Sequence, residues 1–243
     1  MCEEHLQVGS HGLVQGLPTI IASVTGQVSL KDLTSAQVRG MDVVELRVDL
    51  FSNQNAASLV YYMRSVVETI PTLLTIRCRE EGGKFDGDEQ ARLLLYKQLI
   101  PFAHAVDVEL ESSIAEDVLA EAKSHGRMSI LSYHDFEETP DADDLSKLAN
   151  QAYEMSNDAI FKVATKVHGY EDVLMLTRFL TEHDGRDLIV LGMGECGIKT
   201  RIFFPALVSL ATYAAFGDAT APGQLGLDEM ASLLQKFYPG YRK

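Results

Sequence analysis

Two lysines in one short apolar segment are suited to nucleophilic chemistry. Lys162 and Lys166 lie in DAIFKVATKV, residues 158–167, where branched and aromatic side chains indicate a buried strand. Side chains alternate along a strand, so both lysines share one face. Burial disfavours a charged lysine, and a neutral amine attacks carbonyl carbons. The segment predicts an imine-forming lysine; a strand lysine that reaches solvent is the ordinary alternative, and spacing alone does not separate the two.

A histidine stands at the end of another predicted strand. His134 lies in SYHDF, residues 132–136. Histidine exchanges protons most readily near neutral pH, so His134 is a candidate general acid and base. A hydrogen-bonded structural histidine is the alternative.

Two predicted strands carry charged residues on one face and aliphatic residues on the other. The charged residues are Glu45, Arg47, Asp49, Asp107, Glu109 and Glu111. If the strands form a barrel, these side chains face its lumen, where charges are costly unless they are paired or used. We interpret Asp107 and Glu111 as structural, and Glu45 and Arg47 as candidates for binding.

Further polar residues follow the carboxyl ends of other strands. They are Arg77, Glu80 and Glu81 before and within a glycine-containing loop, Arg201 at a helix start, and Thr220 and Gln224 on a turn. Together with the lysine and the histidine, they predict carbonyl chemistry on a small carboxylated and hydroxylated substrate.

Strands and helices that alternate along the chain must position these residues. The predicted strands are Thr19–Thr25, Asp42–Leu50, Pro71–Cys78, His104–Leu110, Met128–Tyr133, Ala159–Val167, Asp187–Gly192 and Ala211–Phe216. Helical periodicity connects them, from a first helix capped by Ser29 to a segment at Ile198–Ser209 and a last helix at 227–237. Such alternation predicts parallel strands with covered faces, in a closed barrel or an open doubly wound sheet.

The count of units favours the barrel. Eight units in fewer than 230 residues, without a GxGxxG turn after the first strand, are typical of a (β/α)8 or TIM barrel. We therefore predict an α/β fold with one domain over residues 1–243. Residues 1–18 form an N-terminal extension that caps the barrel floor.

Composition excludes several partners. The chain has 35 acidic and 21 basic residues and therefore a net charge of −14. This charge argues against nucleic acid and anionic membranes as the main partners. Cys2, Cys78 and Cys196 are far apart and form no metal-binding pair, which is typical of a reducing compartment. With no signal-like or spanning segment, we expect a cytoplasmic protein.

Six segments together resemble one enzyme family, the type I 3-dehydroquinate dehydratases. They are ELRVD at 45–49, TIRCREEGG at 75–83, SYHDF at 132–136, FKVA at 161–164, MGECGIKTR at 193–201 and APGQ at 221–224. The resemblance implies a lyase of the shikimate pathway of aromatic amino acid biosynthesis. Its substrate is 3-dehydroquinate, and its product is 3-dehydroshikimate.

The resemblance also implies residue roles. Lys162 forms a Schiff base with the ring ketone, His134 acts as general acid and base in a syn elimination of water, and Glu81 orients the histidine. The implied substrate-binding residues are Glu45, Arg47, Arg77, Met193, Arg201, Thr220 and Gln224. Arg201 holds the substrate carboxylate, and neither a metal nor a diffusible cofactor is needed. A homodimer is expected.

The chain departs from the family pattern at two hydroxyl positions and carries a cysteine near the site. Thr200 and Thr220 stand where serine is common, and both keep the hydroxyl. We interpret Cys196 as an inert thiol. Two other functions remain open: a class I aldolase on the same fold, and a non-catalytic barrel that binds a ligand. The histidine beside the imine and the arginine for a carboxylate favour the dehydratase.

Overall fold

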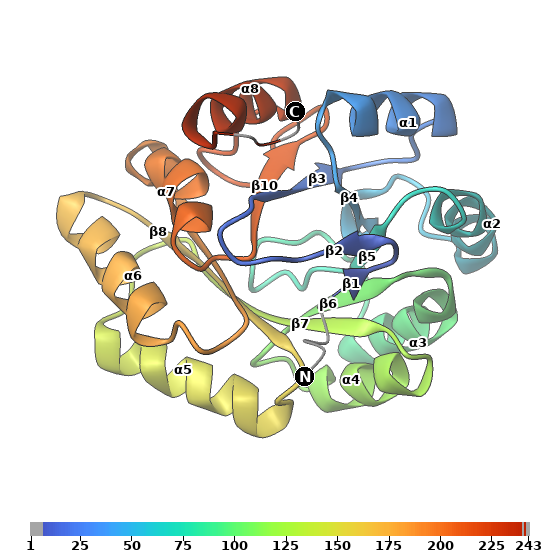
Figure 1. Cartoon of the computed structure of the whole chain (residues 1–243). Helices are drawn as coiled ribbons and strands as arrows, with labels where there is room; N and C mark the ends of the chain where they lie inside the picture. The colour runs from blue at the N-terminus through green and yellow to red at the C-terminus, as the bar shows by residue number, and fades with distance from the viewer. Residues whose placement is uncertain (1–6, 240, 242–243) are drawn as a thin grey trace, which may run out of the picture.

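A nearly closed barrel of eight parallel strands, surrounded by eight helices, forms the part of the chain that the computed structural model describes, residues 7–239 and 241 (Figure 1). The strands are β3 (Thr19–Val24), β4 (Val43–Arg47), β5 (Thr72–Thr75), β6 (Ala105–Glu109), β7 (Met128–Asp135), β8 (Ile160–Lys166), β9 (Leu188–Met193) and β10 (Ala211–Ala215). Their order in the sheet is β10-β3-β4-β5-β6-β7-β8-β9. The predicted (β/α)8 barrel is confirmed.

Amphipathic helices cover the outside of the barrel. They are α1 (Leu30–Arg39), α2 (Ala56–Val67), α3 (Glu89–Leu99), α4 (Ala115–Ser124), α5 (Ala142–Met155), α6 (Tyr170–Glu182), α7 (Ile198–Phe203) and α8 (Leu227–Phe237). Ser29 caps α1 as predicted, because its hydroxyl accepts a hydrogen bond from the Asp32 N–H at 3.2 Å. Side chains between the sheet and the helices form the larger hydrophobic core.

Several predicted elements are too long. The strand predicted at Asp42–Leu50 ends at Arg47, and a 3-10 turn at Val48–Leu50 follows it. The strand predicted at Pro71–Cys78 is limited to β5. The helix predicted at Ile198–Ser209 breaks after α7, where Pro205 lacks the N–H that would continue it.

The lumen is filled in layers, because alternate residues of each strand point inward. An apolar layer at the amino ends of the strands contains Ile21, Val43, Leu73, Ala105, Ile130, Ile160 and Ile189. Two residues further along six of these seven strands stand the buried polar residues Ser23, Glu45, Thr75, Asp107, Ser132 and Lys162, whereas β9 has Leu191 there. The polar layer therefore begins one step above a closed apolar floor.

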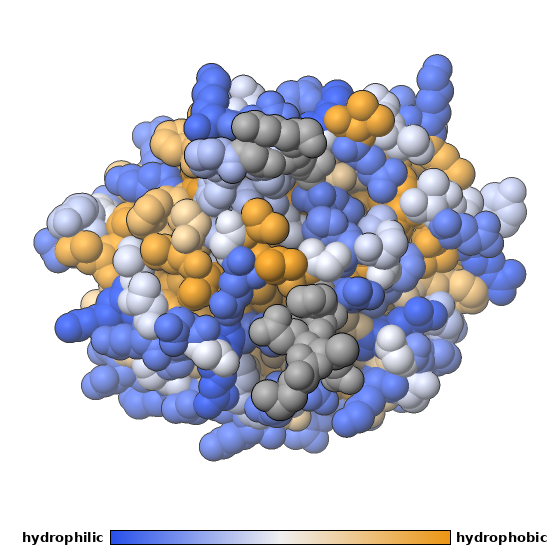
Figure 2. Space-filling model, in the orientation of Figure 1, coloured by the Kyte–Doolittle hydropathy of each residue, from blue (hydrophilic) through white to orange (hydrophobic). Residues whose placement is uncertain are grey.

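A short hairpin lies against this floor. It pairs β1 (Gln7–Val8) with β2 (His11–Gly12) in antiparallel fashion. Val8 and Leu13 are buried in the same hydrophobic cluster as the apolar layer. Figure 2 shows this side of the molecule, where hydrophilic residues cover most of the periphery. Residues 1–6 of the predicted extension lie outside the described residues.

One junction of the barrel has no strand ladder. In the described sheet β9 and β10 are the two outermost strands, so the ladder is open between them. A single backbone hydrogen bond, from the Leu210 N–H to the Leu188 carbonyl at 2.8 Å, joins their amino-terminal ends. We call this junction the β9–β10 seam.

Candidate active site

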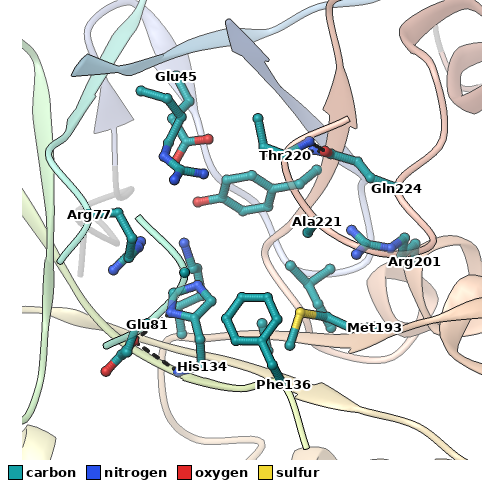
Figure 3. Close-up of a pocket in the computed structure, with 16 residues that line it drawn as sticks. Glu45, Arg77, Glu81, His134, Phe136, Met193, Arg201, Thr220, Ala221 and Gln224 are labelled. Atoms are coloured by element: carbon teal, nitrogen blue, oxygen red, sulfur yellow. Dashed lines mark hydrogen bonds and ion pairs between the residues drawn. The ribbon is translucent and has the colours of Figure 1, made fainter. Parts of the chain in front are cut away.

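The candidate active site is a pocket at the carboxyl ends of the strands. Its lining includes all ten residues predicted for the site: Glu45, Arg47, Arg77, Glu81, His134, Lys162, Met193, Arg201, Thr220 and Gln224. Figure 3 shows Arg77, Glu81 and His134 on one side and Thr220, Gln224 and Arg201 on the other. The fold thus brings together segments that lie far apart in the sequence.

Lys162 is held in the lumen by a buried carboxylate. Its Nζ donates a hydrogen bond to Asp107 Oδ2 at 2.6 Å, and both side chains are almost completely buried. The other carboxylate oxygen, Oδ1, accepts hydrogen bonds from Arg77 at 2.8 Å and from Ser132 at 2.7 Å. Despite burial, these cations hold the pKa of Asp107 well below its usual range. Lys162 therefore faces a fixed negative charge.

Lys166, the rival amine, is not among the residues that line the pocket. It occupies the last position of β8 and is half-buried. The geometry therefore distinguishes two lysines that spacing alone could not separate.

His134 and Glu81 form a buried pair. His134 Nδ1 lies 2.7 Å from Glu81 Oε2, and the same oxygen accepts the His134 backbone N–H at 3.0 Å (Figure 3). Burial and the cations Arg77 and Lys162 lower the pKa of His134 well below its usual value. Burial, with Glu109 and Asp107 nearby, raises the pKa of Glu81 to about 8. The imidazole is therefore neutral near pH 7 and able to accept a proton.

Hydrogen bonds within the polar layer fix Glu45 and Arg47. Glu45 Oε1 accepts a hydrogen bond from Thr75 at 2.9 Å, and Oε2 accepts one from Ser23. The guanidinium of Arg47 donates two hydrogen bonds to Asp49, at 3.0 and 2.8 Å. Asp49 thus pairs with Arg47 although it lies in the 3-10 turn that follows β4.

The second predicted charged strand is shorter than expected. Because β6 ends at Glu109, Glu111 is exposed and does not face the lumen. Glu109 connects Arg77, at 2.9 Å, to the fully buried Arg92 of α3, at 2.6 Å. Asp107, for which the sequence pattern favours a structural role, contacts the candidate nucleophile directly.

Arg201 is a buried cation without a carboxylate partner among the described residues. Its Nε has no hydrogen-bond partner there, and its one hydrogen bond runs to the Pro222 carbonyl at 3.5 Å. Burial lowers its pKa to about 10, so the side chain stays charged at neutral pH. A buried guanidinium in this state is suited to an anionic ligand.

Thr200 positions the helix that carries this arginine. Its hydroxyl accepts the Gly192 N–H at 2.8 Å and donates to the Gly197 carbonyl at 2.6 Å. The hydroxyl therefore attaches α7 to the end of β9.

The turn after β10 is closed by its own side chains. Gln224 Oε1 accepts hydrogen bonds from the Thr220 N–H at 2.7 Å and the Thr220 hydroxyl at 2.9 Å (Figure 3). We call residues 220–224 the closing turn. Met193, at the end of β9, supplies a buried apolar surface in the same pocket.

The sequence pattern does not predict all of the residues that line the pocket. Phe136, Leu191 and Tyr213 also face the pocket. Tyr213 was detectable in principle, because alternation along β10 sets it on the same face as Ala211 of the lumen cluster. Cys196 is exposed and is not among the lining residues.

Within residues 7–239 and 241, no group of three or more His, Cys, Asp or Glu side chains is arranged to hold a metal ion. None of the described helices is both long and apolar enough to cross a membrane.

Comparisons with known proteins agree on one family. The family model described as type I 3-dehydroquinase matches residues 20–239. The 3-dehydroquinate dehydratase of Methanococcoides burtonii is 31% identical, over 95% of this chain and 98% of that protein. The crystal structure of the Aquifex aeolicus VF5 enzyme is 32% identical with a TM-score of 0.80, covering 91% of this chain and 99% of that one.

A further solved structure carries a modified ligand. It is the type I enzyme of Clostridium difficile, described with covalent modified comenic acid, at 25% identity and a TM-score of 0.82. The match covers 97% of this chain and 98% of that one.

Proposed function

The chain belongs to the type I 3-dehydroquinase family, and we propose how its residues carry out the dehydration of 3-dehydroquinate to 3-dehydroshikimate. One observation carries the assignment of roles. Lys162, His134 and the unpaired Arg201 line the same pocket. An amine for a ketone, a base for a proton and a cation for a carboxylate are the three groups that this reaction requires.

Lys162 forms an imine with the ring ketone. Overall, an ammonium and a ketone give a protonated imine and one water: two nitrogen protons leave with the ketone oxygen, and one stays on nitrogen. Asp107 Oδ2, 2.6 Å from Nζ in the free protein, stabilises the positive charge before and after this step. The protonated imine then withdraws electrons from the adjacent carbon.

His134 removes the proton from that carbon. The C–H electron pair moves toward the imine, and the hydroxyl on the next carbon leaves with the proton that His134 returns. The depressed pKa of His134 keeps it in the basic form. Glu81, 2.7 Å from Nδ1, holds the ring in place.

The remaining residues bind the ring and its substituents. Arg201 binds the carboxylate, and Glu45, Arg47 and Arg77 bind the ring hydroxyls, consistent with their buried positions around the pocket. Thr220 and Gln224 close over the ring, and Met193 packs against its apolar face.

We also propose that the reaction needs neither metal nor diffusible cofactor, and that the enzyme is a cytoplasmic homodimer whose chain forms one domain. The substrate is the only partner required. The nitrogen of Lys162 carries one positive charge both as the ammonium and as the protonated imine. No step oxidises or reduces the substrate, which supports a mechanism without a redox cofactor.

The test is reductive trapping. Incubation with 3-dehydroquinate and borohydride should add the reduced ring to Lys162, located by peptide mass spectrometry. Lys162→Ala should abolish both the adduct and the ultraviolet-absorbing conjugated product. Lys166→Ala is the matched control, from the same strand face but outside the pocket, and should retain both. An adduct on Lys166 would refute the assignment.

The same experiment separates the alternatives. A class I aldolase would trap an adduct but would release a carbon–carbon cleavage product in place of the conjugated one. A binding module would give neither adduct nor product.

A further inference from the structure

Tyr213 is a lumen residue that the roles given above leave unused. It lies in β10, is 5% exposed and lines the pocket. Its hydroxyl is buried and has no hydrogen-bond partner among the described residues. Leaving a buried hydroxyl unpaired costs free energy, so such a group in an otherwise satisfied layer is suited to a ligand.

None of the carboxylate oxygens near Tyr213 accepts a hydrogen bond from its hydroxyl in the described residues. Both oxygens of Glu45 accept from Ser23 and Thr75, and both oxygens of Asp107 accept from cations. These two carboxylates, together with burial, raise the pKa of the phenol well above its usual value. The hydroxyl therefore keeps its proton and is available as a donor.

The ring of Tyr213 faces the candidate nucleophile. Lys162 Nζ lies 4.6 Å from the ring centroid, a distance typical of a cation–π contact. Once Nζ bonds to the ketone carbon, the oxygen of that carbon lies two bonds from Nζ. It therefore lies near the ring that carries the unpaired hydroxyl.

The substrate oxygens point to a specific partner. The proposed function pairs the carboxylate with Arg201 and the ring hydroxyls with Glu45, Arg47 and Arg77, which leaves the ketone oxygen without a donor. We propose that the Tyr213 hydroxyl donates a hydrogen bond to this oxygen while Lys162 attacks. This inference rests on the proposed function.

The hydrogen bond assists a step in which charge develops on oxygen. One ammonium proton first passes along the 2.6 Å hydrogen bond from Nζ to Asp107 Oδ2, which frees the nitrogen lone pair. The N–C bond then forms, the C=O π pair moves onto oxygen, and the oxygen leaves as water with that proton and a second proton from the nitrogen. Tyr213 donates without transferring its own proton, and a positioned donor acts most strongly where this charge appears. The ring meanwhile stabilises the positive charge on nitrogen throughout.

The test is Tyr213→Phe, which keeps the ring and removes the donor. Rapid mixing with 3-dehydroquinate, followed by borohydride at set times and mass spectrometry, measures the rate of imine formation. We expect this rate to fall about 10²-fold, as for loss of one donor to a developing oxyanion. We also expect the thermal unfolding temperature to stay equal or rise, because an unpaired buried hydroxyl is replaced by an apolar edge.

Tyr153 is a matched control. It lies in α5 outside the pocket, its buried hydroxyl also lacks a partner in the described residues, and the Arg186 guanidinium lies 3.9 Å from its ring centroid. Tyr153→Phe should leave the trapping rate unchanged. Wild-type trapping rates in Tyr213→Phe would overturn the inference and leave the proposed function standing. Failure of the wild-type protein to form an adduct would instead refute the proposed function.

Discussion

Charges around His134 set the pH range in which its imidazole can accept a proton. Arg77 and Lys162, together with burial, lower its pKa well below the ordinary value of about 6.5. A base must be unprotonated to act, so a lower pKa extends activity toward acid. We predict that the acidic limb of a kcat/KM profile, measured from pH 4.5 to 9, lies below pH 6.5.

Glu81→Gln is the matched variant for this profile. Because the pKa of Glu81 is raised to about 8, the carboxyl group is mostly uncharged at pH 7, and the amide resembles it. The variant should keep the acidic limb and lose any change near pH 8 that arises from ionisation of Glu81. An acidic limb at or above pH 6.5 in the wild type would contradict the assigned environment.

Single residues were predictable from the sequence to different degrees. Alternation placed Glu45, Asp107 and Lys162 in the lumen, and the structure puts all three there. It did not predict that Asp107 pairs with Lys162, because that contact depends on how β6, β7 and β8 are staggered. Strand register across a barrel is a property of many segments together, so one strand does not reveal it.

At the scale of elements, α7 is attached closely to β9. A Cβ added at Gly197 would lie 2.6 Å from the Gly192 carbonyl oxygen. Only a residue without a side chain permits this approach, which leads directly to Arg201 four residues later. The position of the binding arginine therefore depends on a glycine that does not line the pocket.

We predict that Gly197→Ala lowers kcat/KM by about 10²-fold through a displaced Arg201. Most of the loss should appear in KM, because the role proposed for Arg201 is to bind the substrate carboxylate, away from the reacting carbon. The control is Gly185→Ala, at a glycine whose added Cβ would meet nothing within 4 Å. Normal kinetics in a folded Gly197→Ala protein would contradict this dependence.

The elements themselves were largely predictable. Parallel strands buried on both faces and amphipathic helices give strong periodic signals, and all eight units were found. The ends were less predictable. Val48–Leu50 continues the alternation of β4 in sequence but turns as a 3-10 helix, in which Asp49 is placed to bind Arg47. Contacts between distant parts of the folded chain decide where such strands end, and the local sequence pattern does not contain that information.

At the scale of the whole molecule, buried ion pairs join the strands that carry the reacting groups. Asp107 of β6 contacts Lys162 of β8, Ser132 of β7 and Arg77 after β5. Removing one partner of a buried pair leaves the other charge uncompensated. The network therefore stabilises the barrel as well as the site.

We predict that Asp107→Asn lowers the free energy of unfolding by about 3–5 kcal/mol in urea titrations. Asp144→Asn is the control, because Asp144 pairs with Lys147 on the surface at the same 2.6 Å distance. Exposed pairs are screened by water, so that variant should unfold like the wild type. Equal effects of the two substitutions would show that burial does not govern the network.

The net charge of the whole chain is negative, whereas the candidate site gathers several cations. The chain carries −14 overall, yet Arg47, Arg77, Lys162 and Arg201 meet at one pocket. Composition did not predict the sign of the charge at the site, because a sum over 243 residues hides where each charge lies.

The β9–β10 seam makes the backbone hydrogen bonding uneven around the barrel. Lys162 on β8 and His134 on β7 belong to the continuous ladder, where each strand is held on both sides. Arg201 and the closing turn flank the seam, where a hydrogen bond from the Gly194 N–H to the Pro222 carbonyl at 3.0 Å joins the end of β9 to the closing turn. The continuous ladder thus holds Lys162 and His134 in register, while single contacts, through Thr200, Gly197 and Pro222, position Arg201 and the closing turn.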